Sequence, residues 1–228
     1  MVKQDKVLLK EILYLIQKDL VLEWRQKYAL NGMLLYVGSV VFVCYLSFGM
    51  RSNMLVAPVW NAVLWIILLF TSVNAIAKSF MQENRGRLLY FYSIVSPQGI
   101  ILAKIIYNTL LMLLLAIICF VFYGFVLGNP VQDVPMFLLT ILLGAVGFST
   151  SLTMISSIAA KAANSSTLMA VLSFPVIVPM LLMLIRMSKS AMDGLDRSLS
   201  FDELLTLLAI NMIVVTVSYI LFPYLWRS

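Results

Sequence analysis

Between the N-terminal region and Lys161, the charged residues of this chain cluster once, in the stretch from Lys78 to Lys104. Three basic residues and one acid surround a glycine there: Lys78, Glu83, Arg85, Gly86 and Arg87. Charges grouped in this way attract a soluble partner that carries a complementary charge. The chemistry that this stretch offers is therefore recognition of a partner outside a membrane.

An apolar run, residues 88–95, follows these charges, and Ser96-Pro97-Gln98-Gly99 follows the run. This order predicts a short helix at about 79–95 that ends at the proline–glycine turn, so that residues 79–99 form a coupling loop at the cytoplasmic surface. A partner that pushed such a helix would move the apolar segments on both sides of it. The alternative is a solvated loop with no docking role.

Two further patterns concern how helices pack and bend. Gly144, Gly147 and Ser151 are spaced i, i+3 and i+7, which forms a small-residue face that allows another helix to come close. Pro175 and Pro179 lie four residues apart, and each removes a helical N–H donor. The prolines predict either a hinge or substrate-facing bend, or a static kink.

Residue types that carry catalysis are scarce in this sequence. It contains no histidine, which removes the commonest metal ligand and general base, and it contains no P-loop motif for ATP phosphates. We expect no catalytic residue and no metal site, and the isolated Cys44 and Cys119 fit apolar packing. Several side chains are chemically able to contact a porphyrin, although packing explains them equally well, so they predict no substrate site: Met54, Tyr107, Tyr123, Met180 and Met183.

The composition identifies the class of protein. Of the 228 residues, 62% are hydrophobic and only 11% are charged, with a mean hydropathy of +1.01, whereas soluble domains carry about 25% charge. Six runs without a charge are each long enough for a helix to cross the hydrocarbon of a bilayer. The expected fold is therefore an all-α integral membrane protein with one domain over residues 1–228 and spans near 30–50, 56–78, 101–127, 136–160, 167–187 and 204–226.

Residues 3–27 precede the first span and have a helical period. The apolar positions are Leu9, Leu13, Ile16, Leu20 and Trp24, and the polar positions opposite them are Lys10, Glu11, Gln17, Lys18 and Arg25. This pattern predicts an amphipathic helix that lies in the cytoplasmic interface of the membrane. A helix packed on a soluble partner is the alternative.

The basic residues indicate the topology, because Lys and Arg are enriched in cytoplasmic loops. With both termini inside, the cytoplasmic side carries Lys3, Lys6, Lys10, Lys18, Arg25, Lys27, Lys78, Arg85, Arg87, Lys104, Lys161 and Arg227. The outer side carries Arg51, Arg186, Lys189 and Arg197. The sequence thus predicts an N-in, C-in membrane protein, and its positive charge follows topology and does not indicate a nucleic-acid partner.

Three short motifs, in this order, resemble one family: Leu102-Ala103-Lys104, Leu142-Leu143-Gly144 and Phe174-Pro175-Val176-Ile177-Val178-Pro179. Together with the six spans and the amphipathic N-terminal helix, they make the chain similar to CcmB. CcmB is the permease subunit of the ABC-type haem exporter in bacterial cytochrome c maturation. Its broader relatives are the ABC-2 type exporter permeases, which have the same six-span plan.

The resemblance implies a multi-pass protein of the bacterial inner membrane that is not itself an enzyme. A separate CcmA-like ATPase would bind and hydrolyse ATP, and haem would be the possible substrate. CcmC-like and CcmD-like membrane subunits would accompany two copies of the permease. The residues implied to couple to the ATPase are Phe80, Glu83, Arg85, Gly86, Arg87 and Tyr92, in a segment more basic than the Asp-rich version of some members.

Two other functions remain open on the sequence. One is an ABC-2 type permease for another lipid, glycan or drug, and the other is a scaffold subunit that transports nothing. Proteins that co-purify with the chain would distinguish these functions from the haem exporter.

Overall fold

A computed structural model describes residues 2–26, 28–49, 56–76, 95–160 and 165–227. Its N-terminal part contains α1 (Val2–Gln26), α2 (Tyr28–Cys44), the π-helical η1 (Tyr45–Gly49) and α3 (Ala57–Ile76). Its C-terminal part contains α6 (Pro97–Leu127), α7 (Val134–Ala159), α8 (Ser165–Met192), the 3₁₀ helix η2 (Arg197–Ser200) and α9 (Phe201–Arg227). The described residues form helices and connections without a strand.

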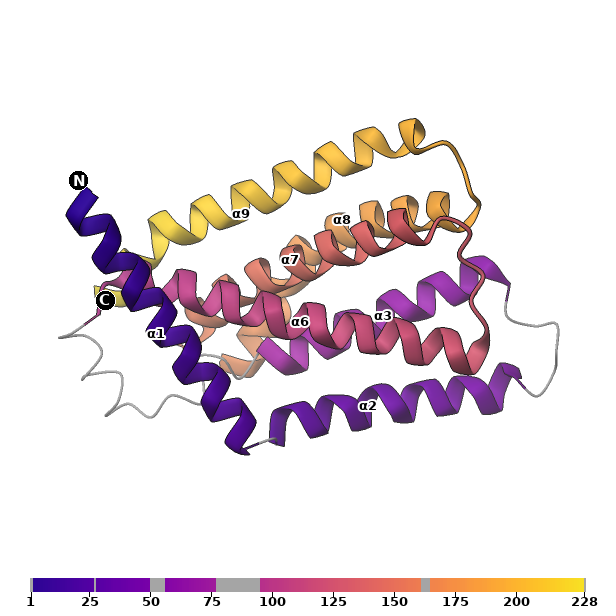
Figure 1. Ribbon diagram of the computed structural model, residues 1–228, viewed down its shortest axis with the longest axis horizontal. Coiled ribbons are helices and arrows are strands. Elements are labelled where there is room, and N and C mark those ends of the chain that lie inside the picture. The colour runs from indigo at the N-terminus through magenta and orange to yellow at the C-terminus, as the bar shows by residue number, and fades with distance from the viewer. Residues whose placement is uncertain (1, 27, 50–55, 77–94, 161–164, 228) are drawn as a thin grey trace.

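Six of these helical segments are long and apolar enough to cross a membrane: α2 with η1, α3, α6, α7, α8 and α9. They run up and down side by side, and both termini lie at one end of the bundle, which we call the termini end (Figure 1). The all-α membrane fold with six spans, expected from the sequence, is confirmed.

The third span begins earlier than the sequence predicted. Ser96 caps α6, because its hydroxyl accepts a hydrogen bond from the Gly99 N–H at 3.3 Å, and Pro97 occupies the first helical position. A proline is well tolerated there, since its missing N–H has no helical partner at that position. Ser96-Pro97-Gln98-Gly99 therefore starts a spanning helix. The sequence-based prediction was wrong here, because it used these residues to end a surface helix and extended the coupling loop to residue 99.

The central helix of the bundle is α7, which packs against α3, α6, α8 and α9. Buried side chains make up 72% of its span, against 17% for α9. Its buried face contains many Gly, Ala, Ser and Thr residues, and small side chains allow neighbouring helices to approach closely in a membrane. The composition of α7 thus explains its central place.

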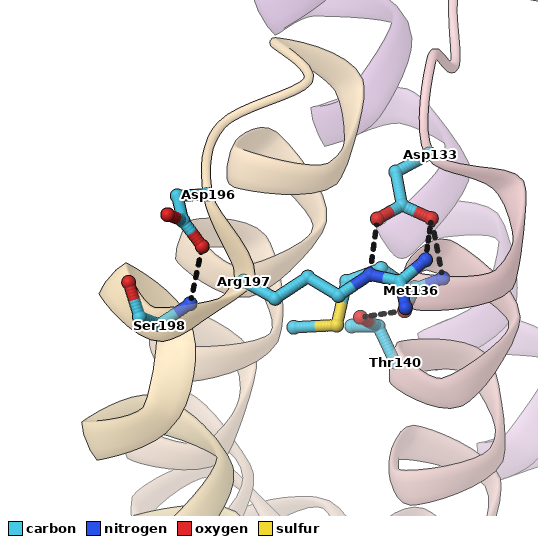
Figure 2. Close-up of polar contacts among 6 residues, drawn as sticks. All are labelled: Asp133, Met136, Thr140, Asp196, Arg197 and Ser198. Carbon is cyan, nitrogen blue, oxygen red and sulfur yellow. Dashed lines mark hydrogen bonds and ion pairs between the residues drawn. The ribbon is translucent and has the colours of Figure 1, made fainter.

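At the end opposite the termini, the α6–α7 and α8–α9 connections are tied together (Figure 2). Asp133 caps α7 by accepting a hydrogen bond from the Met136 N–H at 3.1 Å. The same carboxylate accepts two hydrogen bonds from Arg197, at 2.7 and 3.0 Å, and the Asp133 N–H donates to the Ala191 carbonyl at 2.9 Å. Such a bidentate pair fixes geometry as well as charge, so this contact, the Asp133 clamp, holds α7, α8 and η2 in register.

Candidate functional site

The residues implied to couple the chain to an ATPase all lie outside the described residues: Phe80, Glu83, Arg85, Gly86, Arg87 and Tyr92. The structure describes the two helices that this segment joins. α3 ends at Ile76 and α6 begins at Pro97, both at the termini end of the bundle (Figure 1). The contacts of α3 and α6 therefore determine which other helices a movement of the joining segment would displace.

The termini end of α6 is bound to α1 by three carboxylates. Glu11 accepts a hydrogen bond from the Ser96 hydroxyl at 2.7 Å, on the residue that caps α6. Two turns further along, Asp19 forms an ion pair with Lys104 at 3.2 Å. Beyond it, Glu23 accepts a hydrogen bond from the Tyr107 hydroxyl at 3.4 Å. These six residues, which we call the α1–α6 carboxylate row, attach α1 to the start of the third span.

The Asp19–Lys104 pair is the buried member of this row. The two side chains are only 8% and 9% exposed, so each charge has lost most of its contact with water. A buried charge that loses its partner is strongly destabilising. Lys104 thus forms an ion pair within the chain. The sequence-based topology had counted it only as one of the cytoplasmic basic residues.

Sequence reasoning missed this row because it grouped Glu11 with the polar positions opposite the apolar face of an interfacial helix and assigned it no partner. A signal was present, since positions 11, 19 and 23 are separated by eight and four residues and so share one helical face. Recognising it required knowing which face of α1 meets α6, and that follows from tertiary packing.

The predicted small-residue face of α7 meets three different helices. A side chain on Gly144 would collide with Trp65 of α3, with a carbon only 2.8 Å from the added Cβ atom. A side chain on Gly147 would collide with the Met180 sulfur of α8 and with Asn211 Oδ1 of α9. The glycines therefore stand where α3, α8 and α9 come nearest to α7.

The third member of that face, Ser151, lies among buried polar atoms. In the described part of the chain, Ser151 Oγ and Asn211 Oδ1 are buried without a hydrogen-bond partner. Asn211 does donate from its amide to the Leu143 carbonyl at 3.3 Å, which links α9 to α7. Polar groups inside a membrane bundle commonly join helices in this way.

Hydrogen bonds also connect α3 to α8 and α6 to α7. Trp65 Nε1 donates to Ser188 Oγ at 2.9 Å, and that hydroxyl donates to Asn61 Oδ1 at 2.8 Å. Between α6 and α7, Asn108 donates to Thr153 Oγ1 at 2.8 Å. The two helices that flank residues 77–94 are therefore each bonded to a different helix of the α7–α8 pair.

The two prolines of α8 lie on its exposed side. α8 continues as one helix through Pro175 and Pro179, and both residues are exposed in the single chain, next to Phe174, which is 72% exposed. Their side chains thus point away from the core of this chain, toward whatever surrounds it in the membrane.

The side chains considered for porphyrin contact do not come together. Met180 packs at Gly147, Tyr123 donates to the Trp60 carbonyl at 3.3 Å, and Tyr107 bonds Glu23 at the termini end. Met183 is half-buried, and Met54 lies outside the described residues. Cys44 and Cys119 are buried free thiols, and within the described ranges no three His, Cys, Asp or Glu side chains gather as metal ligands.

The described residues therefore form a membrane bundle in which α1 packs across α6 at the termini end and small residues line the contacts of α7. The model of the CcmB protein family matches residues 10–224 of this chain. The chain belongs to the CcmB family. No curated protein sequence matches it significantly. Membership in the CcmB family implies the permease subunit of an ABC transporter for haem export, with an ATPase partner and other Ccm subunits.

Proposed function

We propose that this CcmB-family chain couples ATP hydrolysis in a separate CcmA-like subunit to haem export or delivery across the bacterial inner membrane. The observation that carries the proposal is the family match over residues 10–224, joined to six helices able to span a membrane. The chain itself is no enzyme under this proposal, because it lacks a P-loop for ATP phosphates. CcmC-like and CcmD-like subunits and a second permease copy complete the proposed complex.

The proposed input is the segment between α3 and α6. Phe80, Glu83, Arg85, Gly86, Arg87 and Tyr92 dock on the ATPase, in a cytoplasmic loop with both chain termini inside. A push on this segment acts on α3 and α6 together, since it is continuous with both. The support for this step is that α3 ends and α6 begins toward the termini end of the bundle (Figure 1).

The proposed path into the bundle follows the buried hydrogen bonds. A displacement of α3 acts on α8 through Trp65, Asn61 and Ser188, and a displacement of α6 acts on α7 through Asn108 and Thr153. The α1–α6 carboxylate row makes α1 move with α6. Pro175 and Pro179 then give α8 a place to bend, because their missing N–H groups leave the helix with fewer hydrogen bonds to break.

The test is a mild-detergent purification of the tagged chain, with the associated proteins identified and ATPase activity assayed. We expect a P-loop ATPase together with a haem-handling membrane protein. The double variant Arg85→Glu/Arg87→Glu should lose the ATPase, because it reverses the charge of the proposed docking segment. The matched variant Arg186→Glu/Lys189→Glu, at the opposite end of the bundle, should retain it.

Each other result points to a different function. An ATPase without haem-handling partners favours a general ABC-2 type permease. Absence of any ATPase, in detergent that preserves a control ABC complex, favours a scaffold that transports nothing. Unchanged ATPase recovery with the double variant would show that the basic segment is not the docking site.

A further inference from the structure

The outward side of α1 is composed differently from the side that packs on α6. Large apolar side chains are exposed along one flank of the helix: Leu9, Leu13, Leu20 and Trp24, of which Trp24 is 73% exposed. Beside this flank, on the side farthest from α6, lie the exposed Lys10, Tyr14, Gln17, Val21 and Arg25. The helix therefore has a protein-facing side, an apolar flank and a mixed side with two basic residues.

The charges of α1 are sorted between these sides. Glu11, Asp19 and Glu23 are directed at α6, where each carboxylate has a partner in the α1–α6 carboxylate row. Over residues 8–25, the part of α1 whose side chains the structure describes, no acidic residue is exposed, whereas Lys10 and Arg25 are. The outward side is consequently apolar and positively charged, although α1 as a whole contains several acids.

This combination fits a membrane surface better than water. Contiguous exposed leucines with a tryptophan and a tyrosine are unfavourable in water and mark an interaction surface. Tryptophan and tyrosine are favoured at the headgroup level of a bilayer, where the ring is buried and its polar atom is hydrated. Lys and Arg beside such a flank are attracted to anionic headgroups.

The position of α1 agrees with this partner. α1 crosses α6 obliquely at the termini end of the bundle, where the spanning helices end (Figure 1). A helix in that place meets the headgroup layer, and its exposed apolar flank reaches the acyl boundary. We propose that the outward side of α1 binds the headgroup layer and selects anionic phospholipids through Lys10 and Arg25. This proposal does not depend on haem export or on ATP coupling.

Trp24 reports on this surface directly. Trp60 and Trp65 are buried at 1% exposure, so in a Trp226→Phe background Trp24 is the accessible indole among the described tryptophans. The full chain is reconstituted into phosphatidylcholine vesicles that contain increasing fractions of brominated phosphatidylcholine or brominated phosphatidylglycerol. Bromine quenches the fluorescence of an indole that it contacts. The control variant Trp24→Phe/Trp226→Phe retains only the buried Trp60 and Trp65, so it measures the quenching that does not come from Trp24.

We expect both brominated lipids to quench Trp24, with phosphatidylglycerol doing so at a mole fraction at least about fivefold lower. Lys10→Gln/Arg25→Gln should keep the quenching and remove the preference between the lipids. The matched Arg186→Gln/Lys189→Gln variant, exposed at the opposite end, should keep both.

Two results would overturn the inference. If neither lipid quenches Trp24, the outward side of α1 faces water or a protein surface. If both lipids quench it equally in the Trp226→Phe chain, in which Lys10 and Arg25 are present, the helix contacts lipid without selecting charge.

Discussion

Lys104→Met is expected to destabilise this chain more than any substitution of an exposed lysine. The change leaves the Asp19 carboxylate without Lys104, in a place where both side chains of the pair are less than a tenth exposed. Breaking a buried ion pair on one side costs about 3–5 kcal/mol. Because Lys18 remains 3.2 Å from Asp19, we expect the lower end of this range, about 3 kcal/mol.

The assay is the midpoint of thermal unfolding of the purified chain in detergent. For a chain of this size, 1 kcal/mol corresponds to about 2–4 °C, so the midpoint should fall by about 6–12 °C. Lys10→Met is the matched control on the exposed side of α1 and should shift the midpoint by less than about 2 °C.

The double variant Asp19→Asn/Lys104→Met tests whether Lys104→Met destabilises the chain through the unpaired Asp19 charge or through lost packing of the Lys104 side chain. It removes both charges, so it should recover most of the loss caused by Lys104→Met alone. A Lys104→Met midpoint equal to that of Lys10→Met, or a double variant no more stable than the single one, would refute the argument that burial makes this pair costly to break.

Three other substitutions test separate parts of the molecule. Gly147→Ala should destabilise the chain by about 1–3 kcal/mol, because the added methyl group meets two buried side chains. Gly38→Ala is the control and should not destabilise the chain, because the space around Gly38 is open. Equal unfolding midpoints of the two variants would contradict this packing argument. The Arg197 hydrogen bonds and the capped Met136 N–H lower the pKa of Asp133 below its ordinary value. As the pH falls, the Asp133 carboxylate is therefore protonated in the unfolded chain before it is protonated in the folded chain. The stabilisation by the clamp is complete above the ordinary pKa of Asp133 and is lost as the pH falls through the lowered pKa. If the unfolding midpoint of an Asp133→Asn variant depended on acid pH in the same way as that of the unsubstituted chain, the clamp would have no such role. Pro175→Ala/Pro179→Ala should impair transport turnover and leave assembly of the complex intact, measured in reconstituted vesicles, and full turnover would show that the bend has no role.

The existence of the six spanning helices was predictable from sequence because the information is local. A charge in the hydrocarbon is costly, so each span appears in the sequence as a run without charge, and the described residues contain six helices long and apolar enough to cross a membrane. Their ends were less predictable. Ser96 and Pro97 are compatible with a turn or with a helix cap, and only the contact of Glu11 with Ser96 and the continuation into α6 distinguish the two.

The small-residue face of α7 was visible in the spacing of its glycines, but its partners were not. Any helix can use such a face, and it is the packed bundle that brings Trp65 to Gly144 and Met180 to Gly147. Asn61 and Asn211 gave no local signal, because their partners lie more than sixty positions away in the chain.

What the sequence determined alone is the class of this protein, its number of spans and the amphipathic period of α1, since hydrophobicity and helical period act over a few neighbouring residues. What only tertiary structure decided is which side of each helix meets which neighbour. Leu13 and Trp24 are exposed and Asp19 is buried on the same helix because Lys104, eighty-five residues away, supplies the charge that makes burial of a carboxylate possible.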